Sequence, residues 1–274
     1  MIKIGFLGPK GTFSHEALKK YTKGKVDCKA CDYNTIPEII MAVDNGEVDE
    51  AIVPMENSLE GAINATMDTM AVSADLKIKA EVIIEVKQNL LVKSGTKMED
   101  IKVILSHPQP IGQCREYLNT HFSRSEIKYV YSTAGAAEEV SRGDFGLAAI
   151  GSVAAAEEYG LEILADNIQD GNINFTRFVV ISKRDSMRTG MDKTSIVFST
   201  EDKPGSLYRI LEIFNLWDIN MIRIESRPAK NQLGRYIFFI DIIGHREDQD
   251  VRDSLAMVKR KSSFFKLLGS YPQI

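Results

Sequence analysis

The sequence predicts an α/β protein made of two α/β lobes followed by a smaller C-terminal domain of the βαββαβ type. Apolar strands and amphipathic helices alternate over the first 182 residues, an order typical of parallel α/β sheets. This alternation occurs twice, in two segments of similar pattern. After residue 193 the pattern changes to short, regular strands and helices. These three observations predict two lobes in the first part of the chain and a separate domain in the second.

Length and composition restrict the class of protein. The chain has 274 residues, of which 44% are hydrophobic and 26% are charged, so it can form about two domains with normal cores. A net charge of −4 without a long basic run argues against nucleic acid as the main partner. No apolar run approaches the ~18 residues that a membrane span needs, and the N-terminus enters a strand rather than a signal peptide. We therefore expect a soluble cytoplasmic protein without a membrane partner.

The cysteine pattern indicates a reducing compartment and no disulfide framework. Cys28 and Cys31 are spaced as in a redox or zinc pair, but the only other cysteine is the distant Cys114. A four-ligand zinc site would need a second pair. Both residues also lie in a segment that looks like a strand, whereas a thioredoxin-like pair opens a helix. We expect these thiols to be structural, and we expect no metal site.

A weak internal repeat covers the two predicted lobes. The segment IKIGFLGPKGTFSHEALKKY, from residue 2, and the segment IKVILSHPQPIGQCREYLNT, from residue 101, both read as strand, turn and helix. Segments that start at residues 34 and 132 continue the two copies with a common layout, so each copy alternates strands with helices. A strand-helix-strand crossover returns the chain in the same direction, which predicts parallel sheets.

Two such lobes imply a cleft, because open α/β sheets bind ligands where strands end and helices begin. Residues 80–92 are long and apolar enough for a strand that crosses between the lobes, and residues 175–182 would close the second crossing. We place the first lobe at residues 1–77 plus 166–182 and the second at 78–165. The predicted cleft residues follow strands and are mostly polar or small: Gly8, Pro9, Lys10, Gly11, Thr12, Ser14, Glu56, Asn57, Ser58, Ser106, His107, Gln109 and Gln113.

The turns at these positions suit an anion. Helix starts expose backbone N–H groups, and the helix dipole adds positive potential there. The turn GPKGTFS lacks the Gly-Lys-Ser/Thr ending of a phosphate-binding loop and is not GxGxxG, so it carries no nucleotide signature. Helix capping alone would account for any one of these turns, but four of them converge on one predicted cleft.

The segment GNINFTRFVVIS, residues 171–182, leads from polar residues into an apolar strand. Asn172 and Asn174 tolerate tight turns. Thr176 and Arg177 stand at the junction, so a hydroxyl and a guanidinium are held at the mouth of a rigid element. We expect the chemistry there, although an ordinary loop with a surface arginine gives the same pattern.

The C-terminal part begins after a change of composition. Residues 183–193 are polar and charged without apolar periodicity, which predicts a linker. Residues 194–274 have the order strand, helix, strand, strand, helix, strand, which is that of a ferredoxin-like sandwich. Such a small open sheet tends to pair with a copy of itself.

The motifs GPKGTFS, PMENSLEG, SHPQPIGQC, GNINFTRF, PGSL and IESRP together resemble the prephenate dehydratase family with a C-terminal ACT regulatory domain. One departure is Ser206, where the family usually has Ala in its Gly-Ala-Leu motif. Family members also occur fused to a chorismate mutase domain, which this sequence does not supply, so we expect the monofunctional form. The resemblance implies a bilobal catalytic domain similar to periplasmic binding proteins at residues 1–182 and an ACT domain at 194–274.

The resemblance implies conversion of prephenate to phenylpyruvate with loss of water and carbon dioxide, and no metal or organic cofactor. The family's essential threonine corresponds to Thr176, which would donate a hydrogen bond to the departing hydroxide. Prephenate is a dicarboxylate, so the site must also bind anions and align the breaking bonds. We expect Thr176, Asn57, Ser58 and Glu56 to be catalytic. We expect substrate contacts from Gly11, Thr12, Ser14, His107, Gln109, Phe175 and Arg177.

Some of these assignments leave alternatives open. A carboxylate at Glu56 beside a dianion is repulsive unless it is protonated or turned away. Arg177 pairs either with a substrate carboxylate or with a salt-bridge partner that fixes the strand. His15 and His107 are candidate acids, yet a histidine at a helix start is as often a cap or a packing residue.

For the second domain, the resemblance implies feedback control by L-phenylalanine bound between two ACT domains. The turn PGSL offers backbone N–H groups at a helix start, and polar and apolar side chains lie on the following strand. We expect ligand contacts from Gly205, Ser206, Leu207, Asn220, Met221, Glu225 and Ser226. Binding at a subunit interface implies a homo-oligomer, either a dimer or a tetramer, with a coupling of ~1–3 kcal/mol between the sites.

Two other functions stay open from the sequence. Arogenate dehydratase catalyses the same elimination on the aminated substrate. A bilobal α/β chain with an amino-acid-binding domain could instead be a cytoplasmic ligand sensor that turns over nothing. Such a sensor would not need Thr176 as a hydrogen-bond donor.

Overall fold

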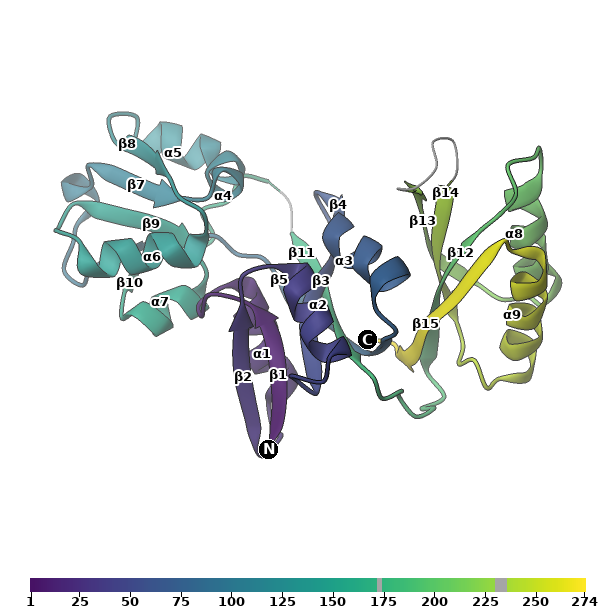
Figure 1. Cartoon of the computed structure of the whole chain (residues 1–274). Helices are drawn as coiled ribbons and strands as arrows, with labels where there is room; N and C mark the ends of the chain where they lie inside the picture. Colours follow the sequence, from purple (N-terminus) through teal and green to yellow (C-terminus); the bar gives the residue numbers. More distant parts are fainter. Residues whose placement is uncertain (172–173, 230–235) are drawn as a thin grey trace. The chain divides into compact units, whose positions relative to one another are not determined.

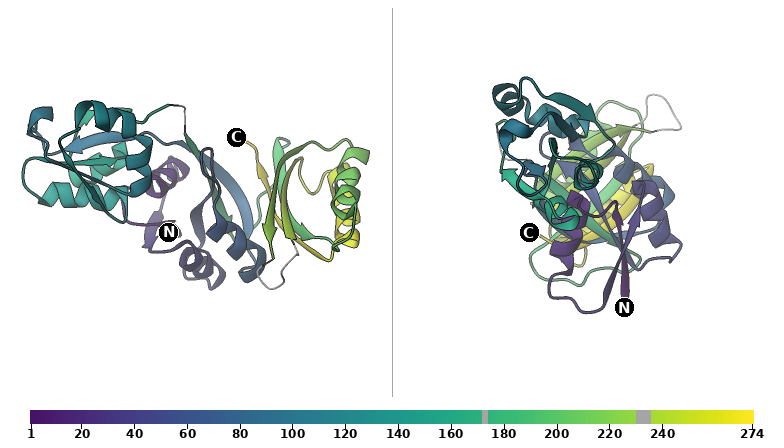
Figure 2. Two further views of the ribbon diagram at one scale, coloured as in Figure 1. Left: turned by 90° about the horizontal axis from the view of Figure 1, so that it is seen from above. Right: turned by 90° about the vertical axis from the view of Figure 1, so that its left-hand side faces the viewer.

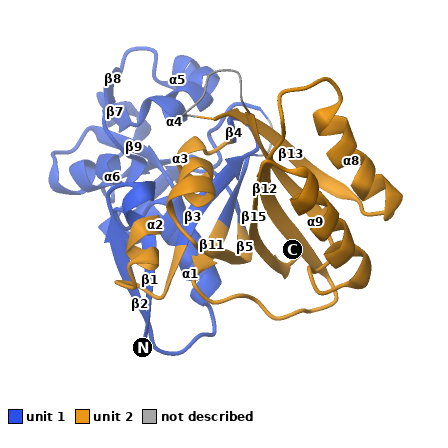
Figure 3. Cartoon of the chain, turned by 45° about the vertical axis from the view of Figure 1, so that its right-hand side comes forward, with its two compact units in different colours: residues 1–39, 52–61, 83–178 blue, residues 40–51, 62–82, 179–274 orange. Residues whose placement is uncertain are grey.

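The computed structural model describes residues 1–171, 174–229 and 236–274. These residues form two compact units, each assembled from separate segments of the chain (Figure 3). Unit 1 consists of Met1–Ile39, Ile52–Gly61 and Ile83–Phe178. Unit 2 consists of Ile40–Ala51, Ala62–Val82 and Val179–Ile274. The C-terminal part of the chain therefore shares a unit with a segment from the first half, residues 62–82.

The first half of the chain begins with alternating strands and helices, as the periodicity predicts (Figure 1). In chain order the elements are β1 (Ile2–Leu7), α1 (Phe13–Thr22), β2 (Cys28–Tyr33), α2 (Ile36–Asp44), β3 (Glu50–Asn57), β4 (Gly61–Ala62), α3 (Asn64–Asp68), the short π-helical turn η1 (Thr69–Ser73) and β5 (Lys77–Glu85). Among the described residues the first sheet has the order β2-β1-β3-β11-β5, and β4 pairs with β3.

The second lobe repeats this arrangement. Its elements are β6 (Asn89–Val92), η2 (Met98–Asp100), β7 (Val103–Ser106), α4 (Pro108–Gln113), α5 (Arg115–His121), β8 (Glu126–Tyr129), α6 (Thr133–Arg142), β9 (Leu147–Gly151), α7 (Val153–Tyr159) and β10 (Glu162–Ala165). The described sheet has the order β10-β6-β9-β7-β8, so β8-β7-β9 corresponds to β2-β1-β3 of the first lobe. The repeat predicted from the sequence is confirmed.

Both faces of the second sheet are covered, which explains its continuous apolar strands. Leu90 and Val92 of β6 pack into one core with α4 and α5, while Leu91 between them packs into another with α6 and α7. Successive strand residues point to opposite faces, so a strand buried on both sides has no polar alternation. The strand β7 is parallel to β8 and β9, whereas β6, which follows the first crossing, is antiparallel to β9.

The chain passes between the two sheets twice. The segment predicted as one crossing strand, residues 80–92, is divided between β5 in the first sheet and β6 in the second. The return passes from β10 of the second sheet to β11 (Phe175–Ser182) of the first. By sheet membership the first lobe extends to Glu85, beyond the predicted boundary at residue 77, because β5 pairs with β11 before the chain leaves the first sheet.

The C-terminal domain has the predicted βαββαβ order. Its elements are β12 (Asp192–Ser199), α8 (Ser206–Leu216), β13 (Met221–Pro228), β14 (Tyr236–Ile243), α9 (Gln249–Lys261) and β15 (Phe264–Pro272). The described strands form an antiparallel sheet in the order β13-β14-β12-β15. Both helices lie on one face of this sheet (Figures 1 and 2), where Ile196, Phe198 and Ile240 pack against Ile213 and Phe214 of α8.

The end of the predicted linker is part of this domain. Asp192 and Lys193 are the first residues of β12, and both are buried. Asp192 accepts hydrogen bonds from the backbone N–H of Thr189 and of Gly190, at 2.8 and 3.0 Å. The polar sequence predicted a linker that includes these two residues, but Asp192 is hydrogen-bonded to the preceding turn and Lys193 is paired with the buried Glu81 at 2.6 Å.

Candidate active site

The end of β3 and the start of β11 are joined by a reciprocal pair of hydrogen bonds. The backbone N–H of Ser58 donates to the carbonyl oxygen of Phe175 at 2.8 Å, and the backbone N–H of Phe175 donates to the Ser58 hydroxyl at 2.9 Å. These strands are neighbours in the first sheet. Their ends therefore bring together the motifs PMENSLEG and GNINFTRF, which the sequence placed at one site.

Asn57 is the centre of this cluster. Its Oδ1 accepts the backbone N–H groups of Leu59 and Glu60 at 2.9 and 3.1 Å. The two branches of an asparagine amide are told apart by their partners, so these two donors fix Oδ1 on the side of the loop. Nδ2 then faces the other way and donates to Thr176 Oγ1 at 2.9 Å and to Asn174 Oδ1 at 2.8 Å.

Thr176 is held as an acceptor by Asn57, which leaves its own proton for another group. Thr176 is 8% exposed, and Asn57 is 6% exposed. A hydroxyl has one proton and two lone pairs. Asn57 occupies a lone pair, and within the described residues no acceptor is bonded to the hydroxyl proton. Thr176 can therefore donate this proton in a hydrogen bond to a ligand.

Glu56 and Arg177 lie on the other face of the sheet from this cluster. Successive residues of a strand point to opposite faces of the sheet. Glu56 therefore points away from the face that carries Asn57, and Arg177 points away from the face that carries Thr176. The two face each other, with 3.7 Å between Arg177 Nη1 and Glu56 Oε2. Of the alternatives that the sequence left open, this geometry favours a salt bridge for Arg177 and a carboxylate turned away for Glu56. The catalytic role of Glu56 and the substrate contact of Arg177 stay predictions.

Polar groups of the turn before α1 form hydrogen bonds with one another. Thr12 caps the helix, because its Oγ1 accepts the backbone N–H of His15 at 3.3 Å. The same oxygen lies 3.0 Å from the carbonyl oxygens of Leu7 and Pro9, to which it can donate. Ser14 is buried within α1. The hydroxyl of Thr12 is thus engaged in the turn.

Gly11 joins the turn to the second lobe. Its φ is +83°, and an added Cβ would lie 3.1 Å from the Cα of Ala155 in α7, so only glycine fits without movement. Its carbonyl oxygen accepts the Ser152 hydroxyl at 2.9 Å, and its N–H donates to His15 Nδ1 at 3.0 Å. Gly11 was predicted to contact the substrate, but its N–H is engaged by His15.

His15 is a packing residue in this structure. It is buried, and its ring stacks on Phe6 with 5.2 Å between the centroids. Burial, followed by the nearby charge of Lys19, lowers the pKa of His15 below its ordinary value. The neutral imidazole is therefore favoured, which suits an acceptor for the Gly11 N–H rather than an acid.

The predicted residues of the second lobe form a helix cap. His107 precedes α4, and its Nδ1 accepts the backbone N–H of Gln109 at 3.3 Å. Both side chains are half-buried. Among the described residues, no hydrogen bond connects these two side chains to Asn57 or Thr176.

Asn174 is the residue that sequence reasoning missed. The residue is 4% exposed, and its Oδ1 accepts from Asn57 Nδ2 at 2.8 Å and from the Ser58 hydroxyl at 3.4 Å. Its carbonyl oxygen also accepts the N–H of Val86 in the first crossing, at 2.7 Å. The period-two spacing of Asn174 and Thr176 was the available signal, since it places both on one face. Asn172 of the same motif lies outside the described residues.

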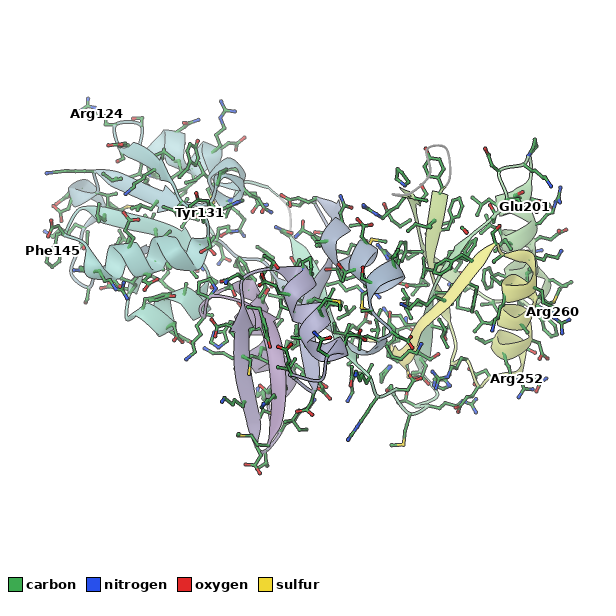
Figure 4. The ribbon with its side chains drawn as sticks, in the orientation of Figure 1. Arg124, Tyr131, Phe145, Glu201, Arg252 and Arg260 are labelled. Carbon is green, nitrogen blue, oxygen red and sulfur yellow. The ribbon has the colours of Figure 1, made fainter. Side chains whose placement is uncertain are left out.

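The predicted ligand residues of the C-terminal domain occupy different environments. Gly205 has a φ of +77° and precedes α8, and a surface pocket at the start of this helix is lined by Ser206, Glu201 and Arg209 among others (Glu201 is labelled in Figure 4). Leu207 and Met221 pack against the core of the domain. Asn220 and Ser226 are exposed, whereas Glu225 is half-buried and points to the opposite face of β13 from Ser226.

The described residues give few other candidates for a functional site. Cys28 and Cys31 lie in β2, as the sequence predicted, and both are unpaired thiols. Among the residues that the structure describes, no group of three or more His, Cys, Asp and Glu side chains is placed to hold a metal ion. No described helix is both long and apolar enough to cross a membrane.

Comparison with known proteins gives a consistent family. The prephenate dehydratase profile matches residues 4–186, and the ACT domain profile matches residues 194–256. The prephenate dehydratase of Methanocaldococcus jannaschii is 41% identical over 271 residues, which cover 96% of both chains.

Solved structures extend the similarity to the whole fold. The structure of a prephenate dehydratase from Arthrobacter aurescens in complex with L-Phe is 37% identical, with a TM-score of 0.90 over 99% of this chain and 90% of the other. A structure described as a novel type of quorum quenching acylase is 29% identical, with a TM-score of 0.87 over 99% of this chain and 98% of the other. The predicted α/β fold class is confirmed. The chain belongs to the prephenate dehydratase family and carries a C-terminal ACT domain.

Proposed function

We propose that this protein converts prephenate to phenylpyruvate, with loss of carbon dioxide and water. The observation that carries the proposal is the Thr176 hydroxyl, which Asn57 Nδ2 holds at 2.9 Å while no described acceptor takes its proton. A donor fixed in this way can stabilise negative charge on a leaving oxygen without reorganising during the reaction. Named relatives with the same activity support the assignment.

The elimination breaks two bonds of prephenate. The pair of electrons in the bond from the ring to its carboxylate moves into the ring, which becomes aromatic as carbon dioxide leaves. The bond from the ring to the hydroxyl oxygen breaks at the same time, and the oxygen leaves as hydroxide, which becomes water when it takes up a proton. We assign Thr176 to the hydrogen bond with this oxygen.

The cluster around Thr176 suits a dianionic substrate because it is uncharged. Its side chains are amides and hydroxyls, and the nearest carboxylate on β3, Glu56, points to the other face of the sheet. We propose that Asn57 orients Thr176 and that Ser58 holds the loop beside it. Phe175 is 42% exposed next to Ser58, where its ring can contact the substrate. The predicted contacts from Gly11, Thr12, Ser14, His107, Gln109 and Arg177 stay predictions.

The same geometry disfavours acyl transfer. A serine or threonine nucleophile needs a general base within hydrogen-bond reach. In the described part of the site, Ser58 Oγ is bonded to the Phe175 N–H and to Asn174 Oδ1, and Thr176 Oγ1 is bonded to Asn57 Nδ2. None of these partners is a base, so elimination is the chemistry that this site supports.

The test is phenylpyruvate formation from prephenate by the purified protein, with arogenate as a parallel substrate. Rapid release of phenylpyruvate is the expected result. A preference for arogenate would keep the elimination and change the substrate. No reaction with either compound would contradict the proposal and favour a ligand sensor.

We also propose that L-phenylalanine inhibits the enzyme by binding at the ACT domain, as the resemblance and the L-Phe complex of a relative suggest. The support within this chain lies in unit 2. The face of the sheet that carries no helices packs against α3 and η1. Arg227 Nε and Nη2 donate to Asp68 of α3 at 2.9 and 3.1 Å, and Nη1 donates to Asn64. Arg227, the fourth residue of the motif IESRP, thus connects the ACT sheet to α3.

A second set of contacts reinforces this attachment. The Lys266 ammonium donates to the carbonyl oxygens of Met70, at 2.8 Å, and Ala74. Lys77 Nζ donates to the carbonyl oxygen of Leu267 at 2.8 Å. The helix α3 begins shortly after Ser58 in the chain. A shift of the ACT sheet on ligand binding would therefore move α3 and, through the chain, the segment that contains Ser58.

Three further properties belong to the proposal. We divide the chain into a catalytic domain at residues 1–182 and an ACT domain that begins with β12 at Asp192, with the intervening residues as a connection. A homo-oligomer, dimer or tetramer, is supported by the edge strand β13, on which Ile222 and Ile224 are 43% and 45% exposed. The unpaired thiols Cys28 and Cys31 are compatible with the cytoplasm.

A further inference from the structure

Asn174 is connected to the reacting hydroxyl through a single amide group. Asn57 Nδ2 donates one hydrogen to Asn174 Oδ1 at 2.8 Å and the other to Thr176 Oγ1 at 2.9 Å. An amide nitrogen carries two hydrogens in one plane, so the direction of one bond fixes the direction of the other. The position of Asn174 Oδ1 therefore determines how Asn57 meets Thr176.

The identity of the atoms at this contact follows from the network. Asn57 Oδ1 is fixed by the backbone N–H groups of Leu59 and Glu60. Nδ2 of Asn57 must then be the donor, and the atom of Asn174 that faces it must be an oxygen. The Ser58 hydroxyl donates to the same oxygen at 3.4 Å. One oxygen of Asn174 thus orients both polar residues at the end of β3.

Asn174 is itself fixed by its surroundings. It is 4% exposed, and its backbone carbonyl oxygen accepts the Val86 N–H at 2.7 Å. Val86 lies between β5 and β6, where the chain first leaves the first sheet. Asn174 precedes β11, where the chain returns to that sheet. The side chain that orients Asn57 is therefore anchored at the place where the two crossings meet.

We infer that Asn174 is a positioning residue for the elimination, acting through Asn57 to direct the Thr176 hydroxyl at the leaving oxygen. The inference rests on the proposed prephenate dehydratase activity. It concerns orientation, so its loss should lower the rate of the chemical step more than the affinity for prephenate. Misplacement of a reacting group by about 1 Å can cost about 100-fold in rate.

The experiment is a double-mutant cycle with Asn174→Ala, Asn57→Ala and the double variant, assayed for kcat and KM with prephenate. We expect Asn174→Ala to lower kcat by roughly 10- to 100-fold with little change in KM. The double variant should lose little more than Asn57→Ala alone, because Asn174 acts through Asn57. Fold losses that multiply in the double variant would overturn the inference.

Asn174→Asp gives a readout that a purely structural role would not move. Aspartate keeps an acceptor oxygen for Asn57 Nδ2, so kcat should recover most of what Asn174→Ala loses. The added negative charge faces a dianion, so KM should rise. Equal kcat values for the alanine and aspartate variants would contradict the positioning role.

Asn89→Ala is the matched control. Asn89 is also a buried asparagine of unit 1, 2% exposed, with Nδ2 3.1 Å from the carbonyl oxygen of Gly151. Its loss should lower thermal stability without coupling to Asn57→Ala in kcat. The wild-type assay distinguishes failure of the proposed activity from failure of the role of Asn174. Failure of the wild type to form phenylpyruvate would remove the proposed function, whereas an active wild type with no Asn57 coupling would remove only this inference.

Discussion

The cluster around Thr176 in unit 1 and the packed face of the ACT sheet in unit 2 use polar groups in opposite ways. Around Thr176 the side chains are neutral amides and hydroxyls, and Thr176 keeps a donor for a ligand. On the sheet face, charged side chains are matched within the protein. Glu81 and Lys193 are 2.6 Å apart with side chains 1% and 9% exposed, and Arg227 pairs with Asp68.

This difference follows from the role of each region, which is substrate binding in the first and attachment of the ACT sheet in the second. A dianionic substrate brings its own charge, so a neutral site with oriented donors can bind it without a second charge to desolvate. A sheet that has to stay attached to α3 and η1 needs its charges matched internally, since an unmatched buried charge is costly. We expect charge changes to affect chemistry in the first region and stability or regulation in the second.

The largest expected effect comes from placing a charge in the neutral cluster. Asn57→Asp removes the amide that donates to Thr176 Oγ1 and puts a carboxylate beside the dianion. We expect a loss of about 1,000-fold in kcat/KM, measured as phenylpyruvate formation. Asn45→Asp, the same substitution at an exposed residue, is the control and should leave kcat/KM unchanged. A variant at Asn57 with wild-type activity would show that the neutral cluster is not the site.

Breaking the buried pair of unit 2 should affect stability instead. Glu81→Gln removes the carboxylate that faces Lys193, and we expect a loss of about 3 kcal/mol in the free energy of unfolding. Denaturant titration measures this loss, while kcat of the folded enzyme should persist. Glu99→Gln removes one member of an exposed pair, 3.9 Å apart, and should change stability by less than about 0.5 kcal/mol. Equal losses in the two variants would contradict the role of burial.

The Arg227–Asp68 pair should affect regulation more than turnover. We expect Arg227→Ala and Asp68→Ala to keep phenylpyruvate formation in the absence of L-phenylalanine. Each should raise the inhibitory concentration of L-phenylalanine by about 5- to 150-fold, the usual range of a coupling free energy. Calorimetric binding of L-phenylalanine to the variants separates lost binding from lost coupling. Inhibition that persists at the wild-type concentration in both variants would exclude this pair as the connection.

The smallest expected effect is a pH dependence of stability from His15. Burial lowers the pKa of His15 from its ordinary value of 6.5, so below about pH 6.5 the unfolded chain binds a proton that the folded protein does not. Unfolding then takes up protons, and stability is lost as the pH falls from 6.5 towards the folded pKa. His15→Gln should make this decline shallower, as measured by unfolding midpoints between pH 7.5 and 5. An equally steep decline in the variant would assign the effect to other groups.

Much of the fold could be predicted because its signals are local and periodic. The repeat of strands and helices predicted two similar lobes, which the structure shows with the common strand order β2-β1-β3 and β8-β7-β9. The short elements after residue 193 predicted the C-terminal sandwich. The linker was predicted too long. Its last residues, Asp192 and Lys193, are charged and yet buried, because their partners Thr189 and Glu81 could not be read from composition.

The site was predicted in part for a similar reason. Asn57 and Ser58 were predicted in the cleft because ligands of open α/β sheets bind where strands end, and the family resemblance added Thr176 at the second crossing. The structure brings them within hydrogen-bond distance of one another or of shared partners. Asn174 was seen only as a turn residue, since its role depends on the amide of Asn57. Strand alternation is enough to separate Glu56 from Asn57, because adjacent residues of a strand point to opposite faces of the sheet.

The most direct test of the account compares Thr176→Ser and Thr176→Ala in a single turnover of prephenate with enzyme in excess. Serine keeps the hydroxyl that Asn57 Nδ2 orients, and alanine removes it. We predict that the serine variant stays within about 10-fold of the wild-type rate and that the alanine variant falls by about 100- to 1,000-fold, with prephenate binding similar in both. An alanine variant that forms phenylpyruvate at the wild-type rate would contradict the central role of the Thr176 hydroxyl.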